Sequence, residues 1–353
     1  MTALSMSARP EEDTSLRPVP WRRMGWVTWR QHRVTLAGVV VFLGALMVFL
    51  WLAGRQLHSA YAAAIAACHP ANPLTCPNMV NAFNGTNDYL ANGGILQAVP
   101  VLIGAFAGAP VLARELETGT FRYAWTQGFG RWRWALAKLV LLAVVLAAVA
   151  GVFSLLLSWY YQPYFAEGNQ AVSLTELTPF FTGLFNLRGI GFAAWTLAAF
   201  AIGALAGALI RRVVPALAAT LGVYAGLAFA AGLWLREHYQ TPVVTSNLNV
   251  PGSAWVMSQW WTKGGRFAFA GWPSERLLDQ LCPAGPSGPV GPGGKSKVVG
   301  VAECIAQHGY TQWTSYQPAS RFWPFQWIEG GWLLALSVLL IAATVWLVHR
   351  RAS

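Results

Sequence analysis

The charged residues whose types and spacing suggest a specific task lie in one short stretch, residues 114–138, between two long apolar runs. This stretch opens with a Glu-x-Glu-x-Gly-Thr motif and ends in a basic turn and a lysine. Carboxylates pair with arginines through charge-assisted hydrogen bonds, and glycine permits a tight turn, so these residue types suit docking between protein surfaces. The candidate docking residues are Glu115, Glu117, Gly119, Thr120, Arg131 and Lys138.

Motifs for bond-making chemistry are missing from the sequence. The segment "GPVGPGGKS" resembles a phosphate-binding loop, but Pro289 stands where that loop requires glycine. The sequence also lacks the HExxH, CxxC and GxSxG patterns of metal, redox and nucleophile sites. We therefore expect no catalytic residue, no metal ligand set and no cofactor in this chain, which would not be an enzyme.

The composition places the chain among integral membrane proteins. Of its 353 residues 55% are hydrophobic and only 10% are charged, and the mean hydropathy is +0.43. A helix needs about 20 apolar residues to cross a bilayer, and a continuous apolar run without alternation favours helix over strand. Six uncharged runs reach this length, and they predict an all-α integral membrane protein with six transmembrane helices within a domain at 34–348. The runs are residues 34–53, 95–113, 139–160, 189–210, 213–234 and 330–348.

The distribution of basic residues predicts the orientation of these spans. With the N-terminus inside, the cytoplasmic segments hold 15 Lys and Arg against 5 Asp and Glu, and the outer segments hold 9 against 8. An excess of basic residues marks cytoplasmic loops. We therefore expect a multi-pass protein of the cytoplasmic membrane with both termini inside, and the net charge of +11 needs no nucleic-acid partner.

Two segments precede the first span. Residues 1–20 are polar and contain prolines, which predicts a disordered cytoplasmic tail. Residues 21–33 place their arginines on one side of a helical wheel, which predicts an amphipathic helix lying in the membrane interface against anionic lipid; a basic flank of the first span is the alternative. The residues of this predicted interfacial helix are Arg22, Arg23, Trp29, Arg30 and Arg33.

The four cysteines fall in pairs in two predicted outer loops. Cys68 and Cys76 lie between the first two spans, and Cys282 and Cys304 lie in a large loop, 235–329, predicted to form an extracytoplasmic cap. Disulfides persist in oxidising compartments, and we expect each loop to carry its own bridge. A metal site built from both pairs, with His58, His69 and His308 as further ligands, is the competing interpretation. Within the cap, Ser274 is a candidate N-cap for a short helix up to Leu281.

Glycines recur at four-residue spacing within three of the spans. The pairs are Gly104 with Gly108, Gly203 with Gly207, and Gly222 with Gly226. This spacing lets two helices approach closely, and we expect packing inside the bundle, with dimerisation as the alternative.

Taken together, the motif and the layout resemble the membrane subunits of type-2 ATP-binding cassette (ABC) exporters. Their second span ends in an acidic Glu-x-Glu-x-Gly-Thr segment, and a short helix and a lysine precede the third. The six spans, the amphipathic first helix and the disulfide-bearing outer loop resemble the ABCG-type arrangement. The stretch after Thr120 lacks the usual proline and the first outer loop is long, so the subfamily stays open.

This resemblance implies a function. The chain would be the permease of a bacterial exporter that moves an amphipathic or lipid-like substrate, such as a drug, an antibiotic or a lipid. Two copies of a separate ATPase would bind ATP and Mg²⁺ and would dock on a short helix at 114–128, and a second permease, identical or different, would complete the pathway in membrane lipid. The alternatives are a membrane enzyme or assembly factor with its site in the cap, an ATP-independent carrier or channel, and an ordinary polar loop at 114–138.

Overall fold

The computed structural model describes residues 21–68, 78, 82–83, 94–119, 131–165, 178–247, 250–251, 253–282 and 304–350. In this part of the chain, six helices are long and apolar enough to cross a membrane, which confirms the predicted membrane bundle. Their bounds are Gly25–Cys68, Ile95–Thr118, Trp132–Tyr160, Gly191–Ile210, Val213–His238 and Ala319–Arg350. The predicted tail at 1–20 lies outside the described residues.

The first helix, α1, is much longer than its predicted span. It runs without a break over Trp21–Cys68, 48 residues, so the helix expected over 21–33 is its first part rather than a separate element. At about 1.5 Å per residue α1 measures about 72 Å, more than twice a bilayer core of about 30 Å. The helix therefore continues for several turns past residue 53, where the first span was predicted to end. In its first part, Arg22, Trp29, Arg30 and Arg33 are exposed, and the side chain of Arg23 lies outside the described part.

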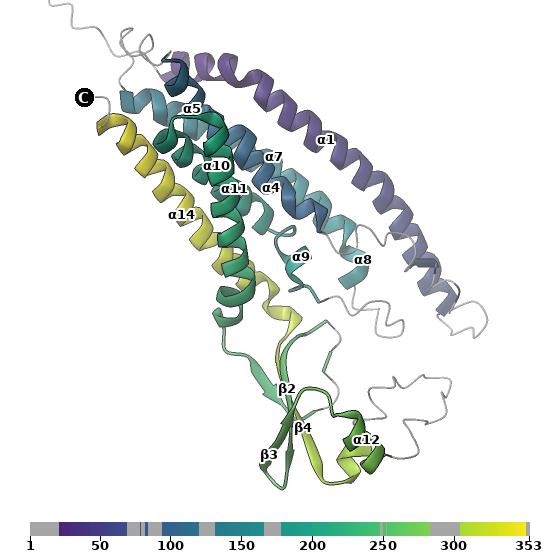
Figure 1. Cartoon of the computed structure of the whole chain (residues 1–353). Coiled ribbons are helices and arrows are strands. Elements are labelled where there is room, and N and C mark those ends of the chain that lie inside the picture. Colours follow the sequence, from purple (N-terminus) through teal and green to yellow (C-terminus); the bar gives the residue numbers. More distant parts are fainter. Residues whose placement is uncertain are drawn as a thin grey trace, which may run out of the picture.

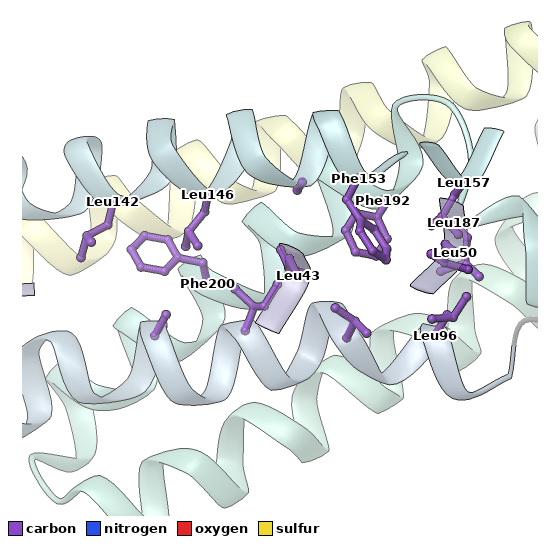
Figure 2. Packing of buried hydrophobic residues seen from close by; sticks show 14 of the residues in the cluster. Leu43, Leu50, Leu96, Leu142, Leu146, Phe153, Leu157, Leu187, Phe192 and Phe200 are labelled. Atoms are coloured by element: carbon purple, nitrogen blue, oxygen red, sulfur yellow. The ribbon is translucent and has the colours of Figure 1, made fainter. Parts of the chain in front are cut away.

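From Leu36 onward, every seventh residue of α1 is buried. Leu36, Leu43, Leu50, Leu57 and Ala64 are each at most 2% exposed. A seven-residue repeat keeps one seam of a helix turned toward a single partner, as in coiled coils. That partner is α7 (Arg131–Tyr160), and Figure 1 shows the two helices side by side. Figure 2 shows Leu43 and Leu50 among the leucines and phenylalanines of α7 and α10 (Gly191–Ile210) in one continuous core.

The helix α10 is the centre of the bundle. It contacts α7, α14 (Phe322–Arg350), α11 (Val213–Ala230) and the second span. The second span runs through η1 (Ile95–Gln97), α4 (Ala98–Ile103), the π-helical η2 (Gly104–Gly108) and α5 (Ala109–Thr118).

Two of the three glycine pairs explain the close packing of α10 on the second span. A Cβ atom on Gly104 would lie 2.5 Å from the Cβ of Ala199, and one on Gly203 would lie 2.5 Å from the carbonyl oxygen of Gly104. These pairs therefore pack inside the bundle, as predicted. Gly222 and Gly226 on α11 differ, because nothing lies within 4 Å of a Cβ built on either residue.

A small antiparallel sheet lies at one end of the bundle, which we call the sheet end. At the opposite end, Figure 1 shows α5, the turn between α10 and α11, and the end of α14. We call this opposite end the terminal end. The four strands lie in the order β1-β4-β2-β3. They are β1 (Val243–Thr245), β2 (Trp255–Lys263), β3 (Arg266–Ala270) and β4 (Tyr310–Gln317). The sheet corrects the all-α prediction for this region.

A disulfide and a short helix cover one side of this sheet. Ser274 caps α12 (Glu275–Leu281) by accepting a hydrogen bond from the backbone of Leu277, as predicted. Cys282 and Cys304 form the predicted disulfide. Beneath them the buried Trp261 packs in a small apolar core with Ile305, Phe269, Leu278 and Tyr310. Cys68 is also disulfide-bonded, and its predicted partner Cys76 lies outside the described residues.

The boundaries of the cap differ from the predicted 235–329. After α11 the fifth span continues through the π-helical η4 (Ala231–Leu235) and η5 (Arg236–His238). At the other boundary, η6 (Ala319–Arg321) and the first two turns of α14 precede the predicted start of the last span at 330. Four charged residues assigned to the cap therefore belong to membrane-length helices: Arg236, Glu237, Arg321 and Glu329.

Candidate functional site

The predicted docking stretch begins where α5 ends. Gly119 has the left-handed backbone angle φ +72° that favours glycine, and it stops the helix after Thr118. Thr120 and the rest of the stretch up to residue 130 lie outside the described residues, and so does most of the short helix predicted at 114–128. Arg131 begins α7, and its side chain is not described. The structure therefore defines the two ends of the stretch, which are fixed in α5 and α7.

Glu115 and Lys138 join these two helices by an ion pair. The ammonium of Lys138 donates a hydrogen bond to the Glu115 carboxylate, and the Lys138 side chain is 1% exposed against 19% for Glu115. The Lys138 Nζ also lies 4.3 Å from the centroid of the Trp134 ring. Removing one partner from such a pair leaves a buried charge and typically costs about 3–5 kcal/mol, so this pair fixes α5 to α7.

Glu117 holds a third helix at the same place. Its carboxylate accepts a hydrogen bond of 3.1 Å from the backbone N–H of Val213, the first residue of α11. The N-terminus of a helix carries unpaired N–H groups and a partial positive charge, which a carboxylate stabilises. The turn before it contains Arg211 in the left-handed conformation, φ 58°, and Arg212 in an extended one.

Glu115 and Glu117 therefore connect helices within this chain. We expected them to meet basic residues of a partner, or Arg131 and Arg133 of their own loop, and the structure gives Glu115 a different partner. Apart from Glu117, which is exposed but hydrogen-bonded to Val213, several exposed ionisable residues at the terminal end are basic. They are Arg114, Arg211, Arg212, His349 and Arg350.

A second polar cluster lies at the sheet end, inside the bundle. Arg236 and Glu329 are each 1% exposed, and the guanidinium donates hydrogen bonds of 2.8 and 3.0 Å to the two carboxylate oxygens. The same guanidinium donates to the Asn186 Oδ1 at 2.6 Å and lies 4.0 Å from the centroid of the Phe185 ring. The pair joins η5 to α14 and to the turn before α10.

Aromatic donors complete this cluster. The indole N–H of Trp195 donates to Glu329 at 2.9 Å, and the hydroxyl of Tyr239 donates to the other carboxylate oxygen at 3.3 Å. Trp332 in turn donates to the Tyr239 hydroxyl at 2.8 Å. Burial, and next to it the charge of Glu329, raise the pKa of Tyr239, which keeps its hydroxyl protonated as a donor.

Sequence reasoning missed this cluster because it placed Arg236 and Glu329 in a solvated cap. The sequence did contain a signal for the cluster in the positions of these two residues. Arg236 lies just after the fifth apolar run, and Glu329 lies just before the sixth. An acid and a base at the facing ends of consecutive spans are neighbours if the spans pack as an antiparallel pair. Buried charges at membrane depth are rare and are paired when they occur.

Neither cluster has the arrangement of a reactive centre. Both consist of ion pairs and hydrogen bonds that connect helices, and the Nη1 of Arg236 is the one buried polar atom of these two pairs without a hydrogen-bond partner among the described residues. In the part of the chain that the structure describes, no group of three or more His, Cys, Asp and Glu side chains could hold a metal ion. What these clusters can do is hold helices in fixed relative positions at the two ends of the bundle.

A comparison with known families agrees with this membrane architecture. The family model described as "ABC-2 membrane transporter related" matches residues 38–236, which include the first five spans and the Glu-x-Glu-x-Gly-Thr motif. No curated protein and no solved structure matches the chain.

Proposed function

Because the chain belongs to the family of ABC-2 membrane transporter related proteins, we propose that it is the permease subunit of a bacterial ABC exporter in the cytoplasmic membrane. A separate ATPase chain, in two copies, supplies the energy, and a second permease chain completes the pathway. The observation that carries this proposal is the junction of α5, α7 and α11 through Glu115, Lys138 and Glu117, because it lies where the family motif meets the membrane.

The terminal end is the cytoplasmic one in this proposal. The excess of basic residues lies in the segments at that end, in keeping with the rule that cytoplasmic loops are rich in Lys and Arg. Exposed tryptophans stand near both ends of the spans, as expected for side chains at membrane interfaces. They include Trp26, Trp132 and Trp346 toward the terminal end, and Trp234, Trp323 and Trp327 toward the sheet end.

The junction suggests how force from an ATPase enters the permease. A push on the stretch between Gly119 and Arg131 acts on α5 and α7 together, because Glu115 and Lys138 join them. Glu117 passes the same displacement to the start of α11. The tightly packed helices then move as a body, since packed interiors transmit displacement rather than absorb it.

The docking surface for the ATPase is basic in this proposal. The acids of the motif are engaged within the chain, whereas Arg114 and Arg212 are exposed beside them and can pair with carboxylates of a partner. The substrate is amphipathic or lipid-like, because the apolar spans have mean hydropathy values of 1.8 to 2.9 and offer few groups to bind a sugar or an ion.

The test is co-purification with the ATPase and ATP-dependent transport in liposomes. Arg114→Gln with Arg212→Gln should weaken retention of the ATPase and lower transport by about tenfold, as loss of charge-assisted contacts predicts. The matched control is Arg266→Gln with Arg276→Gln, two exposed arginines at the sheet end, which should leave both unchanged. Equal ATPase retention by both double variants would contradict a basic docking surface.

Orientation is tested separately with a membrane-impermeant maleimide on intact cells. A cysteine at Arg266 should react from outside, whereas one at His349 should react only after permeabilisation. The reverse pattern would overturn the proposed topology.

A further inference from the structure

Arg188 is a cation at the sheet end whose hydrogen-bond donors are not satisfied. It lies in the turn between α9 (Thr182–Phe185) and α10. Its Nε and Nη1 atoms are buried and have no hydrogen-bond partner among the residues that the structure describes. Its Cζ lies 4.2 Å from the centroid of the Phe165 ring and 5.0 Å from that of the Phe322 ring. Aromatic rings therefore cover the guanidinium, and no acceptor meets these two N–H groups.

Two other arginines at the sheet end, Arg236 and Arg321, have acceptors. Arg236 has Glu329, and the Nη1 of Arg321 donates to the carbonyl oxygen of Thr241 and to the Gln317 Oε1, both at 2.6 Å. The ion pairs between described residues join Arg236 to Glu329 and Lys138 to Glu115, and Arg188 takes part in neither. Arg236 also has one buried nitrogen without a partner, its Nη1, but it has the carboxylate of Glu329 as counter-charge, and Arg188 has no such ion pair with a described residue.

Two tyrosines at the end of α7 belong to the same cluster. The hydroxyl of Tyr160 is buried and has no hydrogen-bond partner. Its ring packs edge-on against Tyr161 at 4.9 Å between centroids, and the Tyr161 hydroxyl and the Arg188 charge influence each other. Burial lowers the pKa of Arg188 to about 10, so the guanidinium is still charged at neutral pH, and no acidic side chain of the described residues forms an ion pair with it.

The chemistry of these groups favours an anion. Buried charged donors without acceptors are unfavourable, and native structures usually supply a partner, an ion or a water. A cation–π contact engages the flat face of a guanidinium and leaves the N–H groups at its edge available. Those N–H groups form a planar fork that matches the oxygens of a phosphate group.

The place of the cluster indicates where the anion comes from. Tyr160 ends the third membrane-length helix, and Phe322 opens α14 next to Trp323 and close to Trp327, which are 55% and 66% exposed. Exposed tryptophans at the ends of spans mark the level of lipid head groups. We propose that Arg188, together with Tyr160 and Tyr161, binds the phosphate of an anionic lipid head group or a free phosphate ion.

A short element covers one side of the site. Phe165 is the last residue of α8 (Gln162–Phe165), a helix of a single turn. In this proposal, a shift of this turn exposes the Arg188 donors to the anion. The site does not depend on which side of the membrane the sheet end faces, and it goes beyond the role of a permease.

The test measures lipid retention by the purified full chain. Protein in neutral detergent is incubated with phosphatidylglycerol or phosphatidylcholine and examined by native mass spectrometry, with and without excess inorganic phosphate. Wild-type protein should retain phosphatidylglycerol over phosphatidylcholine, and Arg188→Gln should weaken that retention about tenfold, as the loss of charge-assisted hydrogen bonds predicts. Arg188→Lys keeps the charge but loses the fork, so its retention should lie between the two.

The matched control is Arg55→Gln. Arg55 is an exposed arginine in the second half of α1 that also lies over an aromatic ring. Its Cζ is 5.3 Å from the centroid of the Trp51 ring. Its loss should leave retention unchanged.

Release of the lipid by inorganic phosphate would identify a site for the free anion as well, and resistance to it would identify a lipid site. Equal retention of both lipids by wild-type protein, with no phosphate binding that depends on Arg188, would overturn the proposal. An Arg188→Lys variant that elutes as a folded monodisperse species but binds no better than Arg188→Gln would do the same.

Discussion

Arg236 and Glu329 form a doubly hydrogen-bonded ion pair inside the bundle, although 93 positions separate them in the chain. They close the same end of the fifth and sixth membrane-length helices, the two that flank the sheet. One of these helices precedes β1 in the chain and the other follows β4. The ion pair therefore fixes the relative position of the two helices to which the sheet is connected.

Removal of either charge from this pair should strongly destabilise the protein. Glu329→Gln leaves the buried Arg236 without its counter-charge, and the expected loss is about 3–5 kcal/mol in unfolding free energy. Arg236→Met with Glu329→Leu removes both charges and should recover much of that loss, because an apolar pair has no desolvation penalty. Thermal unfolding in detergent checks both variants, and a double variant no more stable than Glu329→Gln would contradict the ion-pair explanation.

At the terminal end, Glu115→Gln should lower stability by about 3 kcal/mol, since Lys138 stays buried without a counter-charge. Because the same motif is also predicted to dock on a partner, effects on stability and on coupling have to be distinguished. Glu115→Leu with Lys138→Met separates the roles. It should restore thermal stability and still impair ATP-dependent transport, whereas full transport would show that the pair has no part in coupling.

The loss of Glu117 should have a milder effect. Glu117→Ala removes the acceptor for the first N–H of α11, and such caps contribute about 0.5–2 kcal/mol. Glu275→Ala is the matched control, because Glu275 is also exposed and lies in the first turn of a helix, α12. Transport and thermal unfolding should both be affected more by Glu117→Ala, and the opposite order would argue against the contact with Val213.

The glycine pairs should respond in opposite ways to a larger side chain. Gly203→Val forces a side chain into the backbone of the second span and should prevent folding. Gly226→Val faces open space and should leave the chain folded. If α11 forms the contact with a second permease, Gly226→Val should reduce cross-linking between copies, and unchanged cross-linking would place that contact elsewhere.

Loss of the Cys282–Cys304 bridge should affect the sheet rather than the helices. The cysteines are 22 positions apart, and closing a loop of this size is worth about 3 kcal/mol in the chain-entropy model. Cys282→Ser with Cys304→Ser should therefore expose Trp261 to a soluble quencher while the helical circular dichroism remains. Unchanged quenching would show that the strands hold this core alone.

The sequence was most informative where a single physical requirement dominates. A bilayer demands long uncharged runs, so the six spans could be predicted, although their ends could not, because α1 and the fifth and sixth helices continue past the apolar stretch. The disulfide and the Ser274 cap followed from the compartment and from local hydrogen bonding.

The sheet and the roles of the acids needed more than local patterns. The pair Gly264 and Gly265, both with positive φ, forms the two-residue turn that joins β2 to β3, and this hairpin signal was present in the sequence. The aromatic residues on both sides of this turn, in β2 and β3, were not predicted to form strands, because aromatic residues are also common at membrane interfaces. The partners of Glu115 and Glu117 depend on how three helices pack, and no spacing along the chain encodes that packing.

The single seam that holds α1 also sets the order in which this chain can be built. Its main neighbours are α7 and the short α8, and both lie more than sixty positions beyond its own last residue. While the ribosome is still making the second span, α7 is absent, so the buried leucines of α1 lack the helix that covers them in the folded protein. Biogenesis of this protein thus includes an interval in which an apolar helix of unusual length has not yet met its main partner, and the synthesis of α7 ends it.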